Sequence, residues 1–171
     1  IQVGSICDRK NQLGALKLLL PFLKESEHRE FVYAGGIIDK QYQEEIENFA
    51  KVNGVANQVK YLGEVQPGKI LNEYYNSASS MLFPSKSEGF SLVVIEAMAA
   101  GVPVIINENL QFKLAEKCLR YKNEENFNDI LKKEILNIDK QKELSEKARN
   151  EVLLHYSWNK ISEDYYKTWF K

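Results

Sequence analysis

Apolar residues follow two alternating spacings along the chain, and these spacings predict strands and helices in turn. Residues 1–4 and 29–34 form short, dense apolar runs, which are typical of buried strands. Residues 11–25 instead carry leucines mostly three or four positions apart, the spacing of a helix with one buried face. The leucines that we expect in the core are Leu13, Leu16, Leu19, Leu20 and Leu23.

The same alternation continues over the rest of the chain. Further strands are predicted at residues 59–62, 81–83, 104–106 and 119–121, and further helices at residues 41–52, 70–77 and 92–100. From Phe127 onward the pattern is helical, with a break near Ser157 and Trp158. Strands that alternate with helices predict a parallel sheet covered by helices on both faces. We therefore expect a Rossmann-like α/β fold, with residues 1–171 forming one domain.

Composition and charge narrow the class of protein. The 171 residues are 44% hydrophobic, enough for one sizeable core. Lys and Arg number 23 against 24 Asp and Glu, so the chain lacks the basic excess that nucleic-acid binding usually needs. The cysteines, Cys7 and Cys118, lie far apart without a metal-binding spacing, which favours a reducing compartment and argues against a zinc site. The longest apolar stretch, residues 92–106, is interrupted by polar and helix-breaking residues and is too short for a membrane span.

The most informative segment runs from Pro84 to Ile105, with the sequence PSKSEGFSLVVIEAMAAGVPVI. A predicted strand ends at Phe83, a polar loop follows, and a helix begins near Ser91, a favoured N-cap residue. Ligands of such folds bind at the carboxyl edge of the sheet. The free N–H groups and dipole of a helix start suit a phosphate or diphosphate there, and Gly89 would let the backbone come close to it.

Two carboxylates, Glu88 and Glu96, lie on either side of this loop-to-helix junction. A carboxylate beside a diphosphate would repel it, so both are better placed toward the hydroxyl groups of a sugar and a ribose. The competing interpretation is a glycosidase with paired carboxylates. The phosphate-type helix start favours the first interpretation.

The E-x7-E spacing of Glu88 and Glu96, followed by AMAAGVPVI, resembles glycosyltransferase family 4. The resemblance covers nearly the whole chain, but only the C-terminal, nucleotide-sugar-binding domain of these GT-B enzymes. It implies a retaining enzyme that transfers a hexose from a UDP- or GDP-sugar, and an N-terminal acceptor domain that this chain lacks. We expect no metal cofactor, because a D-x-D pair is missing from the sequence. The start of the chain at Ile1, inside a predicted strand, is what we expect of a domain cut from a longer protein.

By position, the resemblance assigns Glu96 to the ribose hydroxyls and Glu88 to the transferred sugar, with Glu88 as the catalytic residue. Lys10, six residues after Gly4, matches the lysine that neutralises the diphosphate. Ser5 stands where the family has an arginine, and Arg9 is a candidate to replace it. The remaining residues that we expect around the nucleotide sugar are Gly4, Gly63, Ser85, Gly89, Phe90, Ser91 and Leu92. Residues 107–111 also depart from the family pattern, which has a glycine-rich turn and a glutamate there.

The family resemblance further implies bacterial polysaccharide, lipopolysaccharide or capsule synthesis. We expect a cytoplasmic protein, with any contact to the inner face of the plasma membrane made by the missing half. Three alternatives share the fold: a sugar-nucleotide epimerase, a phosphorylase, and a non-catalytic nucleotide-binding module. We expect both histidines, His28 and His155, at the surface. The aromatic residues near the C-terminus, Trp158, Tyr165, Tyr166, Trp169 and Phe170, are expected to pack rather than to form a ligand cage.

Overall fold

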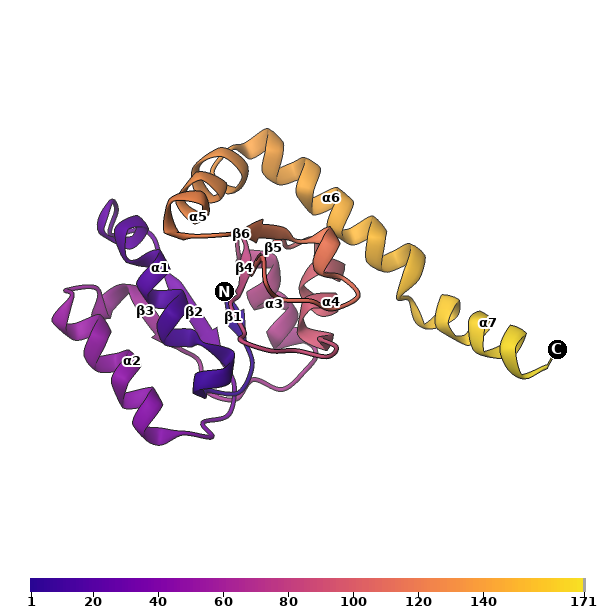
Figure 1. Cartoon of the computed structure of the whole chain (residues 1–171), viewed down its shortest axis with the longest axis horizontal. Helices are drawn as coiled ribbons and strands as arrows, with labels where there is room; N and C mark the ends of the chain where they lie inside the picture. The colour runs from indigo at the N-terminus through magenta and orange to yellow at the C-terminus, as the bar shows by residue number, and fades with distance from the viewer. Residues whose placement is uncertain (171) are drawn as a thin grey trace.

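A computed structural model describes residues 1–170, and its strands run parallel in two hydrogen-bonded sets (Figure 1). The first set has the order β1-β2-β3 and consists of β1 (Gln2–Val3), β2 (Phe31–Ala34) and β3 (Val59–Tyr61). The second has the order β4-β5-β6 and consists of β4 (Met81–Phe83), β5 (Val104–Asn107) and β6 (Leu119–Tyr121).

Two backbone hydrogen bonds join these sets along β1 and β4. The Leu82 N–H donates to the Ile1 oxygen at 2.9 Å, and the Ile1 nitrogen donates to the Ser80 oxygen at 2.9 Å. The spatial order is therefore β3-β2-β1-β4-β5-β6, the doubly wound order of a Rossmann fold. The chain turns to opposite sides of the sheet after β1 and after β4. The loops that follow these two strands consequently emerge side by side at the carboxyl edge.

Helices cover both faces of the sheet, as the alternation predicts. Successive residues of a strand point to opposite faces, and Leu82 and Ile105 lie in one apolar cluster while Phe83 and Ile106 lie in the other. The first cluster is covered by α1 (Gln12–Lys24), α2 (Lys40–Val52) and α5 (Glu124–Ile130). The second is covered by α3 (Lys69–Ser77), α4 (Leu92–Ala99) and α6 (Ile138–His155). The predicted fold class is thus confirmed.

Short helical turns and one break refine the predicted elements. The 3-10 turns are η1 (Asp8–Lys10), η2 (Ala56–Gln58) and η3 (Ala115–Lys117). The uninterrupted helix that we expected after Phe127 is wrong, because α5 passes into a π-helical turn, η4 (Leu131–Ile135), and α6 begins anew at Ile138. Asn137 caps α6 by accepting from the Lys140 N–H at 3.1 Å. The predicted break at Ser157 is confirmed, since α7 (Trp158–Trp169) begins there with Ser157 as its cap.

The core leucines of α1 are mostly placed as predicted. Leu16, Leu19 and Leu23 are buried, whereas Leu13 and Leu20 are only partly covered at the margin of the same cluster. His28 and His155 are exposed, as expected. No helix within residues 1–170 is both long enough and apolar enough to cross a bilayer.

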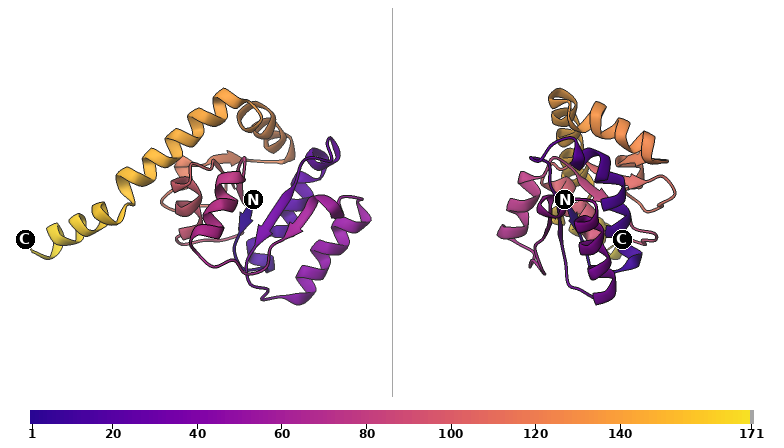
Figure 2. Two further views of the ribbon diagram at one scale, coloured as in Figure 1. Left: turned by 180° about the vertical axis from the view of Figure 1, so that it is seen from behind. Right: turned by 90° about the vertical axis from the view of Figure 1, so that its left-hand side faces the viewer.

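Helix α7 projects away from the rest of the molecule and continues beyond the end of α6 (Figures 1 and 2). Its aromatic side chains face solvent: Trp158 is 85% exposed and Trp169 is 76% exposed. Tyr165, Tyr166 and Phe170 are exposed as well, and Tyr166 and Phe170 stack on each other. The expectation that these residues pack is therefore wrong within the described chain, because α7 leaves the body of the domain instead of lying on it.

Candidate functional site

The loops that follow β1 and β4 are joined to each other at the carboxyl edge of the sheet. The Lys86 N–H donates to the Arg9 oxygen at 2.9 Å, and the Asn11 side-chain amide donates to the Pro84 oxygen at 3.2 Å. Asn11 adopts the left-handed conformation, with φ of 58°, where the chain turns from η1 into α1. Segments more than seventy residues apart in sequence thus form one surface at the switch point of the sheet.

Glu88 lies at the centre of this surface and pairs with two cations. Its Oε1 atom accepts from Lys10 Nζ at 2.5 Å and from Arg9 Nη1 at 2.9 Å. The Glu88 and Lys10 side chains are only 8% and 12% exposed, whereas Arg9 is 51% exposed. Arg9 Nη1 also donates to the Ser87 oxygen at 3.1 Å. The two positive charges of the β1 loop are therefore held by one carboxylate of the β4 loop.

Two buried glutamines fix the backbone that carries these cations. Gln2 Nε2 donates to the Lys10 oxygen at 2.7 Å, and Gln12 Nε2 donates to the Ser5 oxygen at 2.9 Å. Both side chains are almost fully buried, so these bonds are shielded from water. The sequence prediction did not include either residue. A glutamine inside the apolar run of a buried strand was the signal that could have identified Gln2.

Close packing of two glycines shapes the start of the β1 loop. Gly4 has φ of 149°, and a Cβ there would lie 3.4 Å from the Lys10 side chain. Gly35 follows β2 with φ of 148°, and a Cβ there would overlap the Gly4 carbonyl group. The Gly35 N–H donates to the Gly63 oxygen at 2.9 Å, so the three glycines end neighbouring strands. The Lys10 ammonium lies 5.3 Å from the ring centre of Phe83, which closes β4.

Glu96 lies on α4, about one turn from its start, and lines a separate hollow of about 280 Å³. Its Oε2 atom accepts from the Tyr75 hydroxyl at 3.3 Å. Tyr75 comes from α3 and is 2% exposed, and its burial, followed by the charge of Glu96, holds its pKa above the usual range. The tyrosine therefore stays a hydrogen-bond donor to Glu96 at neutral pH. The hollow is lined by Pro67, Gly68, Leu71, Asn72, Tyr75, Glu96, Ala99 and Ala100.

The loop between Glu88 and α4 is exposed at Gly89 and Phe90 and buried at Ser91. Phe90 and Leu92 are 55% and 65% exposed, and a Cβ on Gly89 would meet no atom within 4 Å. Ser91 occupies the N-cap position, as predicted, but its hydroxyl makes no capping bond within residues 1–170. The Ser85 hydroxyl is buried and likewise finds no partner among the described residues. The first amides of α4 are thus left without a side-chain cap.

Comparison with known proteins identifies the family. Residues 1–123 match the family described as glycosyl transferases group 1. The chain belongs to the glycosyl transferases group 1 family. An uncharacterised glycosyltransferase of Methanocaldococcus jannaschii is 35% identical over 88 residues, which make up 52% of this chain and 22% of that protein. The O-antigen chain mannosyltransferase B of Escherichia coli is 45% identical over 47 residues, 28% of this chain and 12% of that protein.

Solved structures of glycosyltransferases share the fold of this group 1 member. The C-terminal domain of a glycosyl transferase group 1 protein from Francisella tularensis superposes with a TM-score of 0.77 at 19% identity, covering 92% of this chain and 85% of that chain. Anabaena HepE, in complex with UDP, gives a TM-score of 0.80 at 18% identity and covers 98% of this chain. The chain corresponds to 48% of HepE, so it spans less than half of that protein.

Most of the predicted residues of this glycosyltransferase chain meet at the carboxyl edge. Glu88, Lys10 and the glycines that end β1 and β3 lie there, together with Ser5, whose backbone oxygen is held by Gln12. Glu96 and Tyr75 instead form the neighbouring hollow between α3 and α4. Sequence reasoning missed Tyr75, since a tyrosine at a buried helix position is usually a core residue. Within residues 1–170, no cluster of three or more His, Cys, Asp or Glu is suited to hold a metal ion.

Residues 107–111, where the chain departs from the family pattern, form a closed turn. The Asn107 side-chain oxygen accepts from the Asn109 N–H at 2.9 Å, and Leu110 is buried. The Glu108 oxygen accepts a hydrogen bond from Arg120 of β6. The turn is therefore stabilised from within and by the neighbouring strand.

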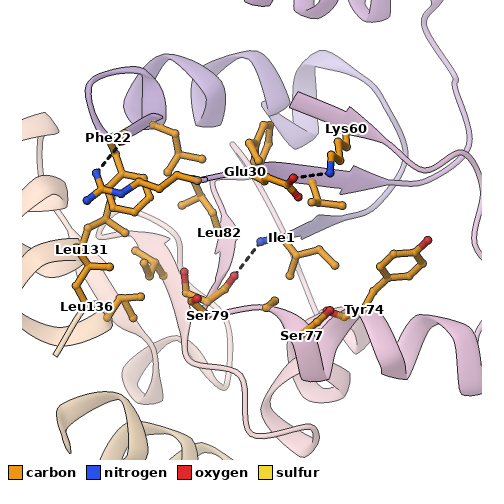
Figure 3. Close-up of a pocket in the computed structure, with 18 of the residues that line it drawn as sticks. Ile1, Phe22, Glu30, Lys60, Tyr74, Ser77, Ser79, Leu82, Leu131 and Leu136 are labelled. Atoms are coloured by element: carbon orange, nitrogen blue, oxygen red, sulfur yellow. Dashed lines mark hydrogen bonds and ion pairs between the residues drawn. The ribbon is translucent and has the colours of Figure 1, made fainter. Parts of the chain in front are cut away.

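A larger cavity, of about 640 Å³, opens at the opposite, amino-terminal edge of the sheet (Figure 3). Apolar side chains such as Phe22, Leu82 and Leu131 form much of its wall, and an ion pair between Glu30 and Lys60 lies at its margin. Its described lining includes none of the residues that the sequence predicts for the site. The cavity and the candidate site therefore lie on different edges of the molecule.

Proposed function

We propose that this chain is the nucleotide-sugar-binding half of a retaining glycosyltransferase of family 4, which transfers a hexose from a UDP- or GDP-sugar. The observation that carries the proposal is the pairing of Lys10 and Arg9 with Glu88, in the loop that leads into the uncapped start of α4. Positive charge and helix-end amides at the switch point of a doubly wound sheet favour a diphosphate. Family membership and the shared fold of UDP-bound HepE support the same ligand class.

Each part of the ligand has a proposed partner. The diphosphate lies against Lys10 and the α4 amides, which stabilise the charge of the leaving group without a metal ion. The ribose hydroxyls bind Glu96 in the hollow beside Tyr75, and the sugar hydroxyls bind Glu88. Gly63, in the loop that follows β3, contacts the base. The backbone of residues 89–92 lines the sugar and diphosphate.

A second domain completes the proposed enzyme by holding the acceptor. Transfer needs an acceptor hydroxyl close to the reacting carbon, in a cleft closed against water. The exposed aromatic face of α7 supports such a partner, because exposed apolar patches of this kind usually mark an interaction surface. We therefore propose that this chain alone binds the nucleotide sugar but does not transfer it.

The proposed cellular role is surface-polysaccharide assembly, as in lipopolysaccharide or capsule synthesis, on the cytoplasmic side of the membrane. The partial similarity to an O-antigen mannosyltransferase supports this setting. Any membrane contact is assigned to the acceptor half.

Calorimetric titration with UDP, GDP, UDP-glucose and GDP-mannose tests the proposal, with wild-type protein and Glu96→Ala compared. Loss of hydrogen bonds to a charged acceptor costs about 1.5–3 kcal/mol, so we expect affinity to fall roughly 10- to 150-fold. Glu73→Ala is a matched control, because Glu73 is an exposed glutamate of α3 outside the hollow. Unchanged affinity in a folded Glu96→Ala variant refutes the ribose role, and failure of wild-type protein to bind any of the four ligands refutes the proposed function.

A further inference from the structure

The ion cluster of the β1 and β4 loops places a carboxylate where the proposed function requires a diphosphate. Glu88 Oε1 lies 2.5 Å from Lys10 Nζ and 2.9 Å from Arg9 Nη1, so a single oxygen holds both cations. Lys86, the cation of the β4 loop, is paired with Asp8 of η1 at 2.6 Å and is half exposed. Lys10 and Arg9 are thus already paired with a carboxylate of the protein, although its single charge offsets only one of theirs.

A diphosphate and the Glu88 carboxylate would compete for these cations. Both are anions. The pair formed by Glu88 and Lys10 is shielded from water, and like charges repel each other more strongly in such a shielded place than in water. A ligand that brings its diphosphate to Lys10 must therefore move the carboxylate away. The loop can rearrange beside Glu88, because Gly89 follows it and a Cβ there would meet no atom within 4 Å.

We propose that Glu88 is an internal placeholder for the diphosphate, and that Arg9 is the second cation that receives the diphosphate when it binds. This inference rests on the proposed function. Binding transfers Lys10 and Arg9 from the carboxylate to the phosphates, and the released carboxylate then turns to the hydroxyl groups of the sugar. Arg9 thereby supplies the charge that is missing at Ser5.

The proposal makes two kinds of ligand respond differently to one substitution. Glu88→Gln removes the competing charge, so ligands that carry only the diphosphate should bind more tightly. The same change removes the charged acceptor for the sugar, so a nucleotide sugar gains less or binds more weakly. If Glu88 merely supported the loop, its substitution would weaken the binding of both ligands together.

Inorganic pyrophosphate is the decisive probe, because it depends on neither the base nor the sugar. We would follow its binding by NMR titration of the 171-residue chain and expect Glu88→Gln to bind it at least threefold more tightly than wild type. Lys10→Ala and Arg9→Gln should each bind it several-fold more weakly. Lys86→Ala is the matched control and should stay within twofold of wild type.

Two outcomes overturn the inference: unchanged or weaker pyrophosphate binding by Glu88→Gln, or wild-type affinity in Arg9→Gln. If Glu88→Gln does not fold, Arg9→Gln still decides whether Arg9 receives the diphosphate. Glu88→Asp, whose shorter side chain draws the carboxylate back from the cations, then replaces Glu88→Gln. Glu88→Asp should then bind pyrophosphate more tightly than wild type. The proposed function fails separately, when wild-type protein binds neither UDP nor GDP; nucleotide binding with no effect of Glu88→Gln removes only the placeholder role.

Discussion

Replacement of Tyr75 by phenylalanine tests whether a buried tyrosine sets the position of the carboxylate that we assign to the ribose. The ring is 2% exposed, and its hydroxyl donates to Glu96 Oε2 at 3.3 Å. Phenylalanine fills nearly the same space, so the core should stay packed. At 3.3 Å the bond is long for an O–H donor, so its loss should lower the free energy of unfolding by only about 0.5–1 kcal/mol.

The effect on nucleotide affinity comes from the freedom that Glu96 gains. Without the hydroxyl, the side chain samples several rotamers, and binding must immobilise it at a cost of about 0.5–1.5 kcal/mol. We therefore expect the Kd for UDP or GDP to rise roughly 2- to 12-fold. Calorimetry would be run on wild type, Tyr75→Phe, Glu96→Gln and the double variant. Tyr74→Phe, at the preceding position of α3, is the control.

A double-mutant cycle separates this positioning role from a general loss of structure. If Tyr75 acts through Glu96, its replacement should cost affinity in the wild type and almost nothing in the Glu96→Gln background. Tyr75→Phe should also have little effect on the affinity for 2′-deoxy nucleotides, which lack one of the hydroxyls assigned to Glu96. Equal losses in both backgrounds, or wild-type affinity in Tyr75→Phe, would refute the reasoning.

Three further predictions concern the β1 loop and the ligand. Ser5→Arg should leave pyrophosphate affinity within twofold in a titration, because Arg9 already supplies the second charge; a clear gain would show that the site lacks a cation. Gly35→Ala should lower the free energy of unfolding in urea by about 2–4 kcal/mol, since its Cβ overlaps Gly4, whereas Gly54→Ala, which meets no atom within 4 Å, should cost only about 1 kcal/mol. Nucleotide-sugar affinity should not change with EDTA, and strict dependence on a divalent cation would contradict the expectation that no metal ion takes part in binding.

The fold could be predicted from the sequence because its signals are local. Short apolar runs and helical leucine spacing are each contained in a few residues, and their alternation is enough to predict a parallel, doubly wound sheet. The boundary between α5 and α6 was harder to place. Asn137, a favoured cap residue, marked the start of α6, but the helical periodicity on both sides concealed the break.

The candidate site could be predicted only in part, because its contacts join distant segments. The sequence placed Lys10 and Glu88 in the same site but assigned them to different groups of the ligand, and their direct contact across 78 positions carries no sequence signal. Hydrophobicity alone likewise predicts that Trp158 and Trp169 are buried. Their exposure follows from the direction in which α7 leaves the domain, which the spacing of residues in a helix does not determine.

The join between β1 and β4 gives the proposed ligand a role in protein lifetime. Two backbone bonds from Ile1 connect the strand sets there, and the loops that hold Lys10 and Glu88 lie on either side of the same join. A nucleotide sugar bound by both loops would therefore oppose any opening between the halves. At a ligand concentration of 100 times Kd, this linkage is worth about 2.7 kcal/mol. If the proposed ligand binds there, proteolysis of the chain should be slower with saturating nucleotide sugar than without it.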